Sequence, residues 1–471
     1  MIKIKIYAVF LFCLISSSIN AQVEASKTDI DINEQLKSVK LIDWSRFHAS
    51  YSATNNQQLA GKILLNCNKY ALTNWWKLRG FEGAPASDYL NLKGITEHFI
   101  RPIAAEAEAL AVSLKTGLYN EAATGVPVNE AESKTVQMIR SLAHAHRANS
   151  EGGWGKHWQS ALWAGYATSA AWMMWDKLDL QTKREVLAMV NFECNWIMTN
   201  KGLPTIKVYR DRNGKIASPG DTGSEENAWD GLILGVASAM MPKLYETGKW
   251  TNKLVSLSLN AMARPSDVKS DKKYNGKPLT EWLVGSNINE DGTAVNHHFI
   301  HPDYMVSAFE LNSAKYFWLA NNKIPKAFTL NADLVFHALA DLNFKVGDKL
   351  EGGTVQEPGG TIFIKDSGEV FYPLGTDWGK GRRMHFAMFN SIITVFSLDK
   401  QVKQRAEQWQ LLQGRVALNM QNRFNDGHTY IDKSEDNYVS REEWVANKAA
   451  TSYIIETLKI VNKPKFTNRS F

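Results

Sequence analysis

The sequence predicts an all-α protein whose paired helices close into an (α/α) toroid with small β-hairpin insertions. Apolar residues recur at helical spacing along most of the chain. Short breaks, such as Glu151-Gly152-Gly153, separate the helical stretches. The chain shows no fixed-period repeat of the kind that open solenoids carry. We therefore expect stacked helix pairs that close on themselves, with inner-helix ends and their loops around a cleft.

The expected helices follow one another with little between them. They cover residues 59–78, 96–118, 130–146, 158–178, 183–198, 226–244, 304–320, 383–396, 402–420 and 443–460. Strand-like alternation is found mainly in residues 361–372, where Asp366-Ser367-Gly368 predicts a hairpin turn. Too few residues remain for a second large domain. We expect one catalytic domain over residues 56–471.

The first 21 residues are typical of a cleaved secretory signal. Lys3 and Lys5 form a basic start, residues 6–15 an apolar core, and residues 16–21 a small-residue exit. Cys13 lacks the small residues that precede a lipidated cysteine. The sequence therefore predicts a periplasmic or secreted protein, with residues 22–55 as an N-terminal lead segment.

Composition narrows the range of functions. Once Lys3 and Lys5 are removed, 52 basic residues face 48 acidic ones, a net charge of +4 that is compatible with an acidic substrate. No basic run is interleaved with aromatics, so we expect no nucleic acid partner. No later stretch is apolar enough to span a membrane. Cys67 and Cys194 allow either one disulfide or two separate buried thiols. Oligomeric state is not predicted.

The most informative segment covers residues 296–304, which hold three imidazoles, an amide and a phenol. Pro302 suits the first position of a helix, which places Tyr304 in the first helical turn. A helix N-terminus and a nearby cation would both lower the pKa of the phenol. We therefore predict that Tyr304 carries protons in catalysis. The alternative is an ordinary interfacial tyrosine with a bonded hydroxyl.

The three histidines of this segment receive different predictions. We expect His298 to face the substrate as a base or cation, and His297 and His301 to support it or the substrate. His297 and His301 are four residues apart, but that spacing pairs metal ligands only on a helix, and Pro302 starts the helix after them. We therefore expect no metal or other cofactor, with metal binding as the alternative.

A second group of candidates opens the helix expected from residue 226. Asn227 is a mediocre helix former that can donate hydrogen bonds to a substrate carboxylate without repelling it. Glu225 and Glu226 fit the role of partners for the helix dipole, although Glu226 is also a candidate for substrate binding. Ser224 or Asp221 can cap the helix.

Two further groups are candidates for substrate binding. Arg382 and Arg383 could clamp a carboxylate through paired hydrogen bonds, and Trp378 could stack on a sugar. The alternative is a solvated loop. Trp154 and His157 lie at the exposed beginning of an aromatic-rich helix. An aromatic stripe on a helix is otherwise usually part of the core.

The order Asn, His, Tyr, Arg in an exported helical toroid resembles the α/α-toroid polysaccharide lyases. The matching positions are Asn227, His298, Tyr304 and Arg382 or Arg383. The run at residues 296–305, with the Glu-Glu-Asn motif before it, looks most like polysaccharide lyase family 38.

That resemblance implies an enzyme acting on β-linked uronic-acid polymers such as glucuronan or mannuronate-rich alginate. Such a lyase removes the C5 proton of a uronate and expels the oxygen at C4, leaving an unsaturated end. The resemblance implies that Asn227, His298 and an arginine neutralise the carboxylate while Tyr304 moves the proton. If the C5 proton and the leaving oxygen at C4 lie on opposite faces of the sugar, the resemblance implies that His298 is the base and Tyr304 the acid.

Two other classes of protein remain open. A toroid glycoside hydrolase acting on glucuronides would use paired carboxylates from among Glu225, Glu226, Asp230 and Asp291. A non-catalytic carbohydrate-binding protein would need only the aromatic groups, and would tolerate loss of the Tyr304 hydroxyl.

Overall fold

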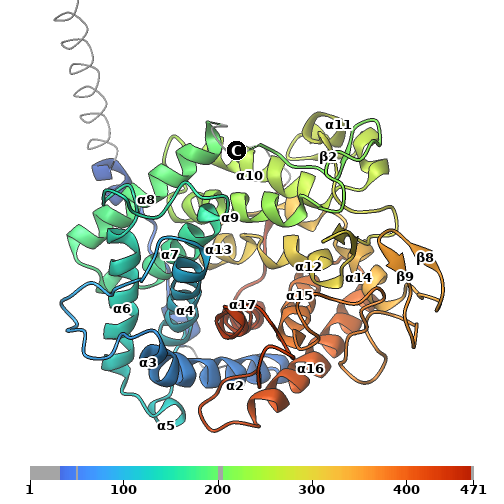
Figure 1. Cartoon of the computed structure of the whole chain (residues 1–471). Coiled ribbons are helices and arrows are strands. Elements are labelled where there is room, and N and C mark those ends of the chain that lie inside the picture. The colour runs from blue at the N-terminus through green and yellow to red at the C-terminus, as the bar shows by residue number, and fades with distance from the viewer. Residues whose placement is uncertain (1–31, 49–50, 200–204, 468–471) are drawn as a thin grey trace, which may run out of the picture.

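The computed structural model describes residues 32–48, 51–199 and 205–467, and most of this chain is helical (Figure 1). The strands in this part are two residues long and form two-stranded pairs. The mostly helical class predicted from the sequence is therefore confirmed. The expected signal at residues 1–21 lies outside the described residues.

The α-helices fall into two sets by their packing partners. One set forms an unbroken succession: α4 (Glu97–Lys115) packs on α7 (Ser160–Met173), α7 on α9 (Ser224–Met240), α9 on α12 (Pro302–Glu310), α12 on α15 (Arg383–Phe396), and α15 on α17 (Arg441–Val461). Helix α17 packs in turn on α4, so the succession returns to its start.

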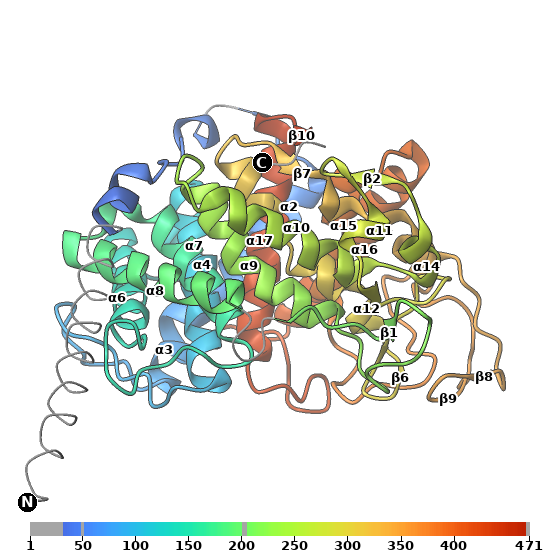
Figure 2. The ribbon, with the colours of Figure 1, turned by 90° about the horizontal axis from the view of Figure 1, so that it is seen from above.

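The second set lies outside the first (Figures 1 and 2). It comprises α2 (Asn55–Tyr70), α6 (Val128–His144), α8 (Leu180–Met198), α10 (Thr247–Met262), α14 (Ala332–Ala340) and α16 (Lys400–Gln421). Helix α2 continues into a π-helical turn, η2 (Ala71–Trp75), and then α3 (Trp76–Leu78). Short helices α5 (Glu121–Thr124), α11 (Leu279–Trp282) and α13 (Ala314–Leu319) lie between these longer ones, and residues 32–38 are also helical.

Burial explains which helices belong to the first set. Every residue of α7 is buried, and so is every residue of α15. A helix that is apolar on all sides must be covered on all sides. The outer helices α2 and α16 instead keep polar, exposed residues along one side. Side-chain caps fix several helix starts: Thr54, Asp179 and Asp399 each accept a hydrogen bond from a backbone N–H in the first turn.

Each expected helix is present, but the longer helices differ from the expectation in three respects. The helix expected over residues 304–320 is broken into α12 and α13, and the Asn312 side chain bonds the carbonyl of Phe309 at the break. Helices α10 and α14 were not among the expected segments. Helix α14 is only nine residues long, so its sequence repeats the helical period only about twice.

The expected hairpin over residues 361–372 is reduced to a single bridge between Phe363 and Val370. Its turn is as predicted, with Asp366 and Gly368 at positive φ. The named strands are β1 (Arg210–Asp211) with β4 (Gly285–Ser286), β2 (Lys273–Tyr274) with β3 (Lys277–Pro278), β5 (Val295–Asn296) with β6 (Phe299–Ile300), β8 (Lys349–Leu350) with β9 (Gly353–Thr354), all antiparallel, and β10 (Phe466–Thr467) with β7 (Ile324–Pro325), parallel.

The described part of the expected lead segment packs against the helices. The Lys40 backbone bonds the carbonyl of Met240 and the indole of Trp172, and Phe47 is buried. Cys67 and Cys194 are both buried and free, which corresponds to the two-thiol alternative. No helix in the described ranges is both long and apolar enough to cross a membrane.

Candidate active site

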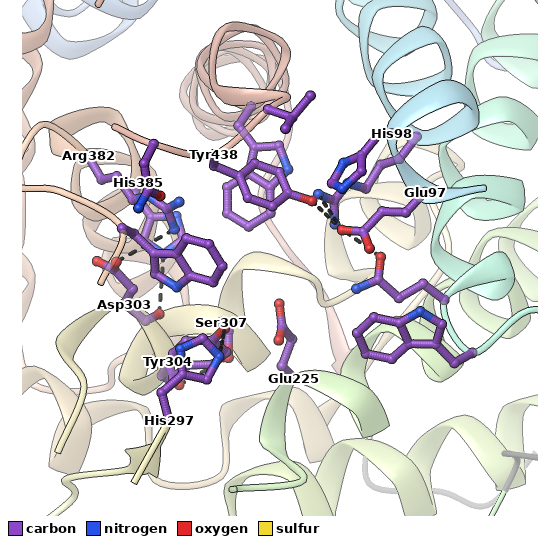
Figure 3. A pocket seen from close by; sticks show the side chains of 17 residues that line it. Glu97, His98, Glu225, His297, Asp303, Tyr304, Ser307, Arg382, His385 and Tyr438 are labelled. Carbon is purple, nitrogen blue, oxygen red and sulfur yellow. Dashed lines mark hydrogen bonds and ion pairs between the residues drawn. The ribbon is translucent and has the colours of Figure 1, made fainter. Parts of the chain in front are cut away.

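A pocket of about 380 Å³ opens where the helices of the first set begin (Figure 3). It is lined by side chains near the N-terminal ends of α4, α7, α9, α12, α15 and α17, and by the three connections that precede α12, α15 and α17. The lining residues are Glu97, His98, Arg101, Trp158, Gln159, Glu225, His297, Asp303, Tyr304, Ser307, Trp378, Arg382, His385, Asn437, Tyr438, Val439 and Trp444. Converging helix N-termini present unpaired N–H groups and positive dipole ends, which favour negative charge nearby.

One wall of the pocket holds a chain of three hydrogen-bonded side chains. The Asp377 carboxylate bonds Nδ1 of His297, and Nε2 of His297 lies 3.2 Å from the hydroxyl of Tyr304. Because the carboxylate accepts from Nδ1–H, the neutral imidazole carries its lone pair on Nε2, and Tyr304 donates its proton there. Tyr304, His297 and Asp377 thus have the order of roles seen in a nucleophile-base-carboxylate triad.

His297 reaches Tyr304 because of an unusual turn. Strands β5 and β6 are joined by two residues only, His297 at φ +51° and His298 at φ +71°. A two-residue hairpin whose central residues both have positive φ is normally built from Asn or Gly. Histidine in this region costs free energy, and such strain accumulates at functional sites. The turn directs His297 into the pocket and leaves His298 exposed.

The carboxylate of Asp377 binds two imidazoles. Burial alone would raise the pKa of Asp377, but hydrogen bonds from His301 and His297 outweigh it and lower the pKa to about 2. Nε2 of His301 lies 3.1 Å from this carboxylate, and His301 is fully buried behind the pocket wall. Asp377 is therefore ionised at any pH at which the protein would act.

The pKa of Tyr304 is raised, whereas the sequence analysis expected it to be lowered. Burial raises the pKa of the phenol strongly, and the charge of Glu225 raises it further. Arg382 acts in the expected direction but is outweighed. Tyr304 is accordingly a protonated phenol at neutral pH, able to act as an acid directly and as a base only by passing its proton to His297.

Glu225 stands at the centre of the pocket, between Tyr304 and His297 on one side and Glu97 and His98 on the other (Figure 3). No described residue donates a hydrogen bond to its carboxylate or forms an ion pair with it. Burial raises the pKa of Glu225 to about 7, against the lowering effect of Arg101. This carboxyl is therefore close to half-protonated near neutral pH and free to bind a ligand.

The remaining charges of the pocket are paired within the protein. Arg382 binds Asp436 through two nitrogens, at 2.9 and 3.2 Å, and lies 3.6 Å from Asp303. Arg101 lies 2.9 Å from Glu97 and donates to Oε1 of Gln159 at 3.1 Å. Both guanidinium groups also lie over aromatic rings that line the pocket, Arg101 over Tyr438 and Trp444, and Arg382 over Trp378, Tyr438 and Trp444.

Five of the residues singled out in the sequence line this pocket: Tyr304, Arg382, Trp378, His297 and Glu225. The first three were expected to touch substrate or the reacting atoms. His297 stands in the place expected for His298, which does not line the pocket and donates its backbone N–H to the carbonyl of Gly220. A Cβ on Gly220 would come within 2.0 Å of the His298 ring, so glycine is needed there.

Other expected site residues lie outside the pocket. Asn227 is buried, and its amide both donates to the carbonyl of Lys207, at 2.8 Å, and accepts from its N–H, at 3.0 Å. Glu226 forms an ion pair with the Lys207 ammonium group. Gln159, instead of Asn227, brings an amide to the pocket. Arg101 and Trp163 donate to the oxygen of this amide, which leaves its NH2 group to donate to a ligand.

Three more expected residues are held elsewhere. Arg383 is buried and bound to Glu369. Trp154 is fully buried, its indole donating to the carbonyl of Leu142, which matches the alternative of a core aromatic. The ring of His157 lies 5.7 Å from that of Trp163 at a tilt of 37°. Trp158, which is 46% exposed, is the aromatic of this patch that lines the pocket.

The sequence analysis did not single out Glu97, His98, Arg101, Gln159, Tyr438 or Trp444 as site residues, although all of them line the pocket. Gln159 follows the aromatic patch directly, so its position was a usable signal. The others come from segments more than 100 residues away from Tyr304, with no local motif to mark them.

His297, His301 and Asp377 also form the arrangement best suited to a metal ion. One ligand atom from each lies within 4.8 Å of the other two. Two imidazoles and a carboxylate are ligands that zinc accepts. The same atoms are already joined by hydrogen bonds, so a metal ion here would replace the bond that orients His297 toward Tyr304.

Replacing Asn227 with alanine tests whether this amide is structural. We expect Asn227→Ala to lower the free energy of unfolding by about 1–3 kcal/mol, because it leaves buried polar groups of Lys207 unpaired. Denaturant or thermal unfolding measures the loss. An unchanged stability together with a large loss of activity would instead return Asn227 to the role expected from the sequence.

Comparison with known proteins found no matching family model and no matching curated protein.

Proposed function

We propose that the protein is a polysaccharide lyase that cleaves β-linked uronic-acid polymers by β-elimination. The observation that carries this proposal is the hydrogen-bonded chain from Asp377 through His297 to Tyr304, which ends in the pocket. We also infer that the closed succession α4–α7–α9–α12–α15–α17 is the inner ring of an (α/α) toroid, with the pocket at the N-terminal ends of its helices.

The pocket suits an acidic sugar. Helix N-termini supply positive potential. The buried guanidinium groups of Arg101 and Arg382 balance the carboxylates of Glu97 and Asp436, which would otherwise repel an acidic sugar. Aromatic rings such as Trp158 and Trp378 offer flat surfaces for pyranose faces. Gln159 and protonated Glu225 can each donate a hydrogen bond to the uronate carboxylate, which must be stabilised before its C5 proton becomes acidic.

The relay explains how a phenol with a raised pKa can act as a base. Tyr304 passes its proton to Nε2 of His297 as its oxygen takes the C5 proton, so a free phenolate does not accumulate. Asp377 stabilises the imidazolium that forms. The electrons of the C5–H bond form the C4=C5 double bond, and the bond from C4 to the glycosidic oxygen breaks.

The leaving oxygen then takes a proton from Tyr304, and His297 returns its extra proton to the phenol. The site ends in its starting state, with an unsaturated sugar and a new hydroxyl as products. This order of proton transfers requires the C5 proton and the leaving oxygen to lie on the same side of the sugar as Tyr304.

We propose that the protein is exported, as the N-terminal sequence indicates.

Removing the Tyr304 hydroxyl tests the core of this proposal. We expect Tyr304→Phe to lower turnover by about 10²–10⁴-fold, because it removes the group that carries the proton. Ultraviolet absorbance of the unsaturated product, with a panel of acidic polysaccharides, measures the rate. A Phe variant that turns over normally removes Tyr304 from the mechanism. A wild-type protein that binds these polymers without forming product is a binding protein.

A matched pair of variants tests which histidine serves Tyr304. We expect His297→Gln to lower turnover by about 10²-fold or more, because Tyr304 loses its proton acceptor. His298→Gln, one residue away but exposed, should leave turnover within about threefold, which is small on the scale of a lost acid or base. The reverse order would contradict the relay. Repeating both assays with a chelator shows whether a metal ion contributes.

Glu225 allows a second candidate function, a glycoside hydrolase, because it is an unpaired carboxyl in the pocket with a pKa of about 7. The other carboxylates proposed for that function, Glu226, Asp230 and Asp291, do not line the pocket.

The variant Glu225→Gln separates the two functions. In the lyase, deprotonated Glu225 repels the uronate, so wild-type kcat/KM should fall as pH rises through about 7. Glutamine stays neutral at every pH, and its amide N–H groups can still donate a hydrogen bond to the uronate carboxylate. We therefore expect the variant to be active, and its kcat/KM should no longer fall as pH rises through about 7. In a hydrolase, Glu225→Gln would abolish activity, and the products would lack ultraviolet absorbance.

A further inference from the structure

A second hollow of about 790 Å³ lies next to the candidate active site. The two share Asn437, Tyr438 and Val439, so the segment 437–439 forms a common wall. The far side of the second hollow is formed by η2 and α3, and by the loop between α16 and α17. The two hollows are therefore direct neighbours.

The carboxylates of the second hollow are satisfied within the protein. Glu443 accepts from the indole of Trp75 at 2.8 Å and lies 3.6 Å from Arg79. Glu442 accepts backbone N–H groups at 2.8 and 2.9 Å. Asp426 accepts from Asn74 at 2.7 Å and also bonds His428. The basic residues that line the hollow, Lys77, Arg79, Lys433 and Arg441, outnumber these three carboxylates.

Two ammonium groups on the same surface remain free. Lys77 and Lys433 are exposed, and neither forms an ion pair or a side-chain hydrogen bond with any residue in the described ranges. Lys77 comes from α3, and Lys433 comes from the loop before α17. This leaves a net positive surface beside the aromatic rings of Tyr70 and Trp75.

The backbone and the rim of the hollow are also unusual. The π-helical turn η2 places Asn74 and Trp75 in its wall, and π-turns within helices are frequent at functional sites. Leu78, Ile431 and Val439 line the hollow although they are 72%, 59% and 68% exposed. Apolar side chains gathered around a concave basic surface are typical of a binding site.

We propose that this second hollow is a subsite for further uronic-acid units of the polymer, with Lys77 and Lys433 binding their carboxylates. This inference rests on the proposed lyase function and extends it, because it predicts a preference for chains long enough to occupy both hollows. The segment 437–439 then lies along the bound chain between the reacting sugar and the distal units.

The test compares substrates of different length in the double variant Lys77→Gln/Lys433→Gln. We expect its kcat/KM to fall roughly fivefold on the long polymer, as two exposed charge contacts are lost. On the shortest oligosaccharide that the wild type cleaves, kcat/KM should stay unchanged. The loss should shrink at high salt, because exposed charges are screened. The control Lys62→Gln/Lys400→Gln removes two exposed lysines outside both hollows.

An equal loss on short and long substrates, or no loss on either, overturns the subsite. A loss in the control as large as in the double variant also overturns it, since net charge alone would then be responsible. Calorimetric titration of the Tyr304→Phe protein with the polymer separates this outcome from failure of the proposed function. If the polymer binds and the added lysine substitutions weaken that binding, the subsite stands even where no product forms. If no acidic polymer binds, both proposals fall.

Discussion

The two-residue turn between β5 and β6 is the constraint on which the candidate site depends. Its strands connect the loop before α9 to the start of α12: Thr222 bonds the carbonyl of Val295, and His298 bonds that of Gly220. The turn thereby sets the positions of Glu225, on α9, and Tyr304, on α12, relative to each other. Two histidines at positive φ cost stability, of the order of 1–3 kcal/mol each. In return, His297 is held against the Tyr304 hydroxyl.

Charge organisation follows from the convergence of helix N-termini on the pocket. Buried cations are costly unless they are paired, and Arg101 and Arg382 are each held by a carboxylate and by aromatic rings. These bonds fix the guanidinium groups without cancelling the dipoles of the helices behind them. Glu225 is the exception, with no bonding partner among the described residues, which is why its protonation can respond to a ligand and to pH near neutrality.

Local sequence patterns predicted most of the long helices, and the bounds expected for α15 match the structure at both ends. The same patterns were less informative about the site. His297 and His298 are equivalent in sequence, and only a turn at positive φ sends one into the pocket and the other into solvent. Asn227 has the chemistry of a carboxylate ligand, yet its amide holds the backbone of Lys207.

The sequence by itself determined the helical class and a polar segment that ends with Tyr304 in the first turn of α12. It did not determine the helix caps: Ser224 or Asp221 was expected to cap α9, but that helix begins after Gly223 without a side-chain cap. Tertiary structure alone decided which partners complete the polar segment. Asp377 reaches His297 across 80 residues, and Asp436 reaches Arg382 across 54. Periodicity is a property of neighbouring residues, so it can be read along the chain. The direction of a side chain in a turn, and the remote groups that meet it, depend on how the helices pack.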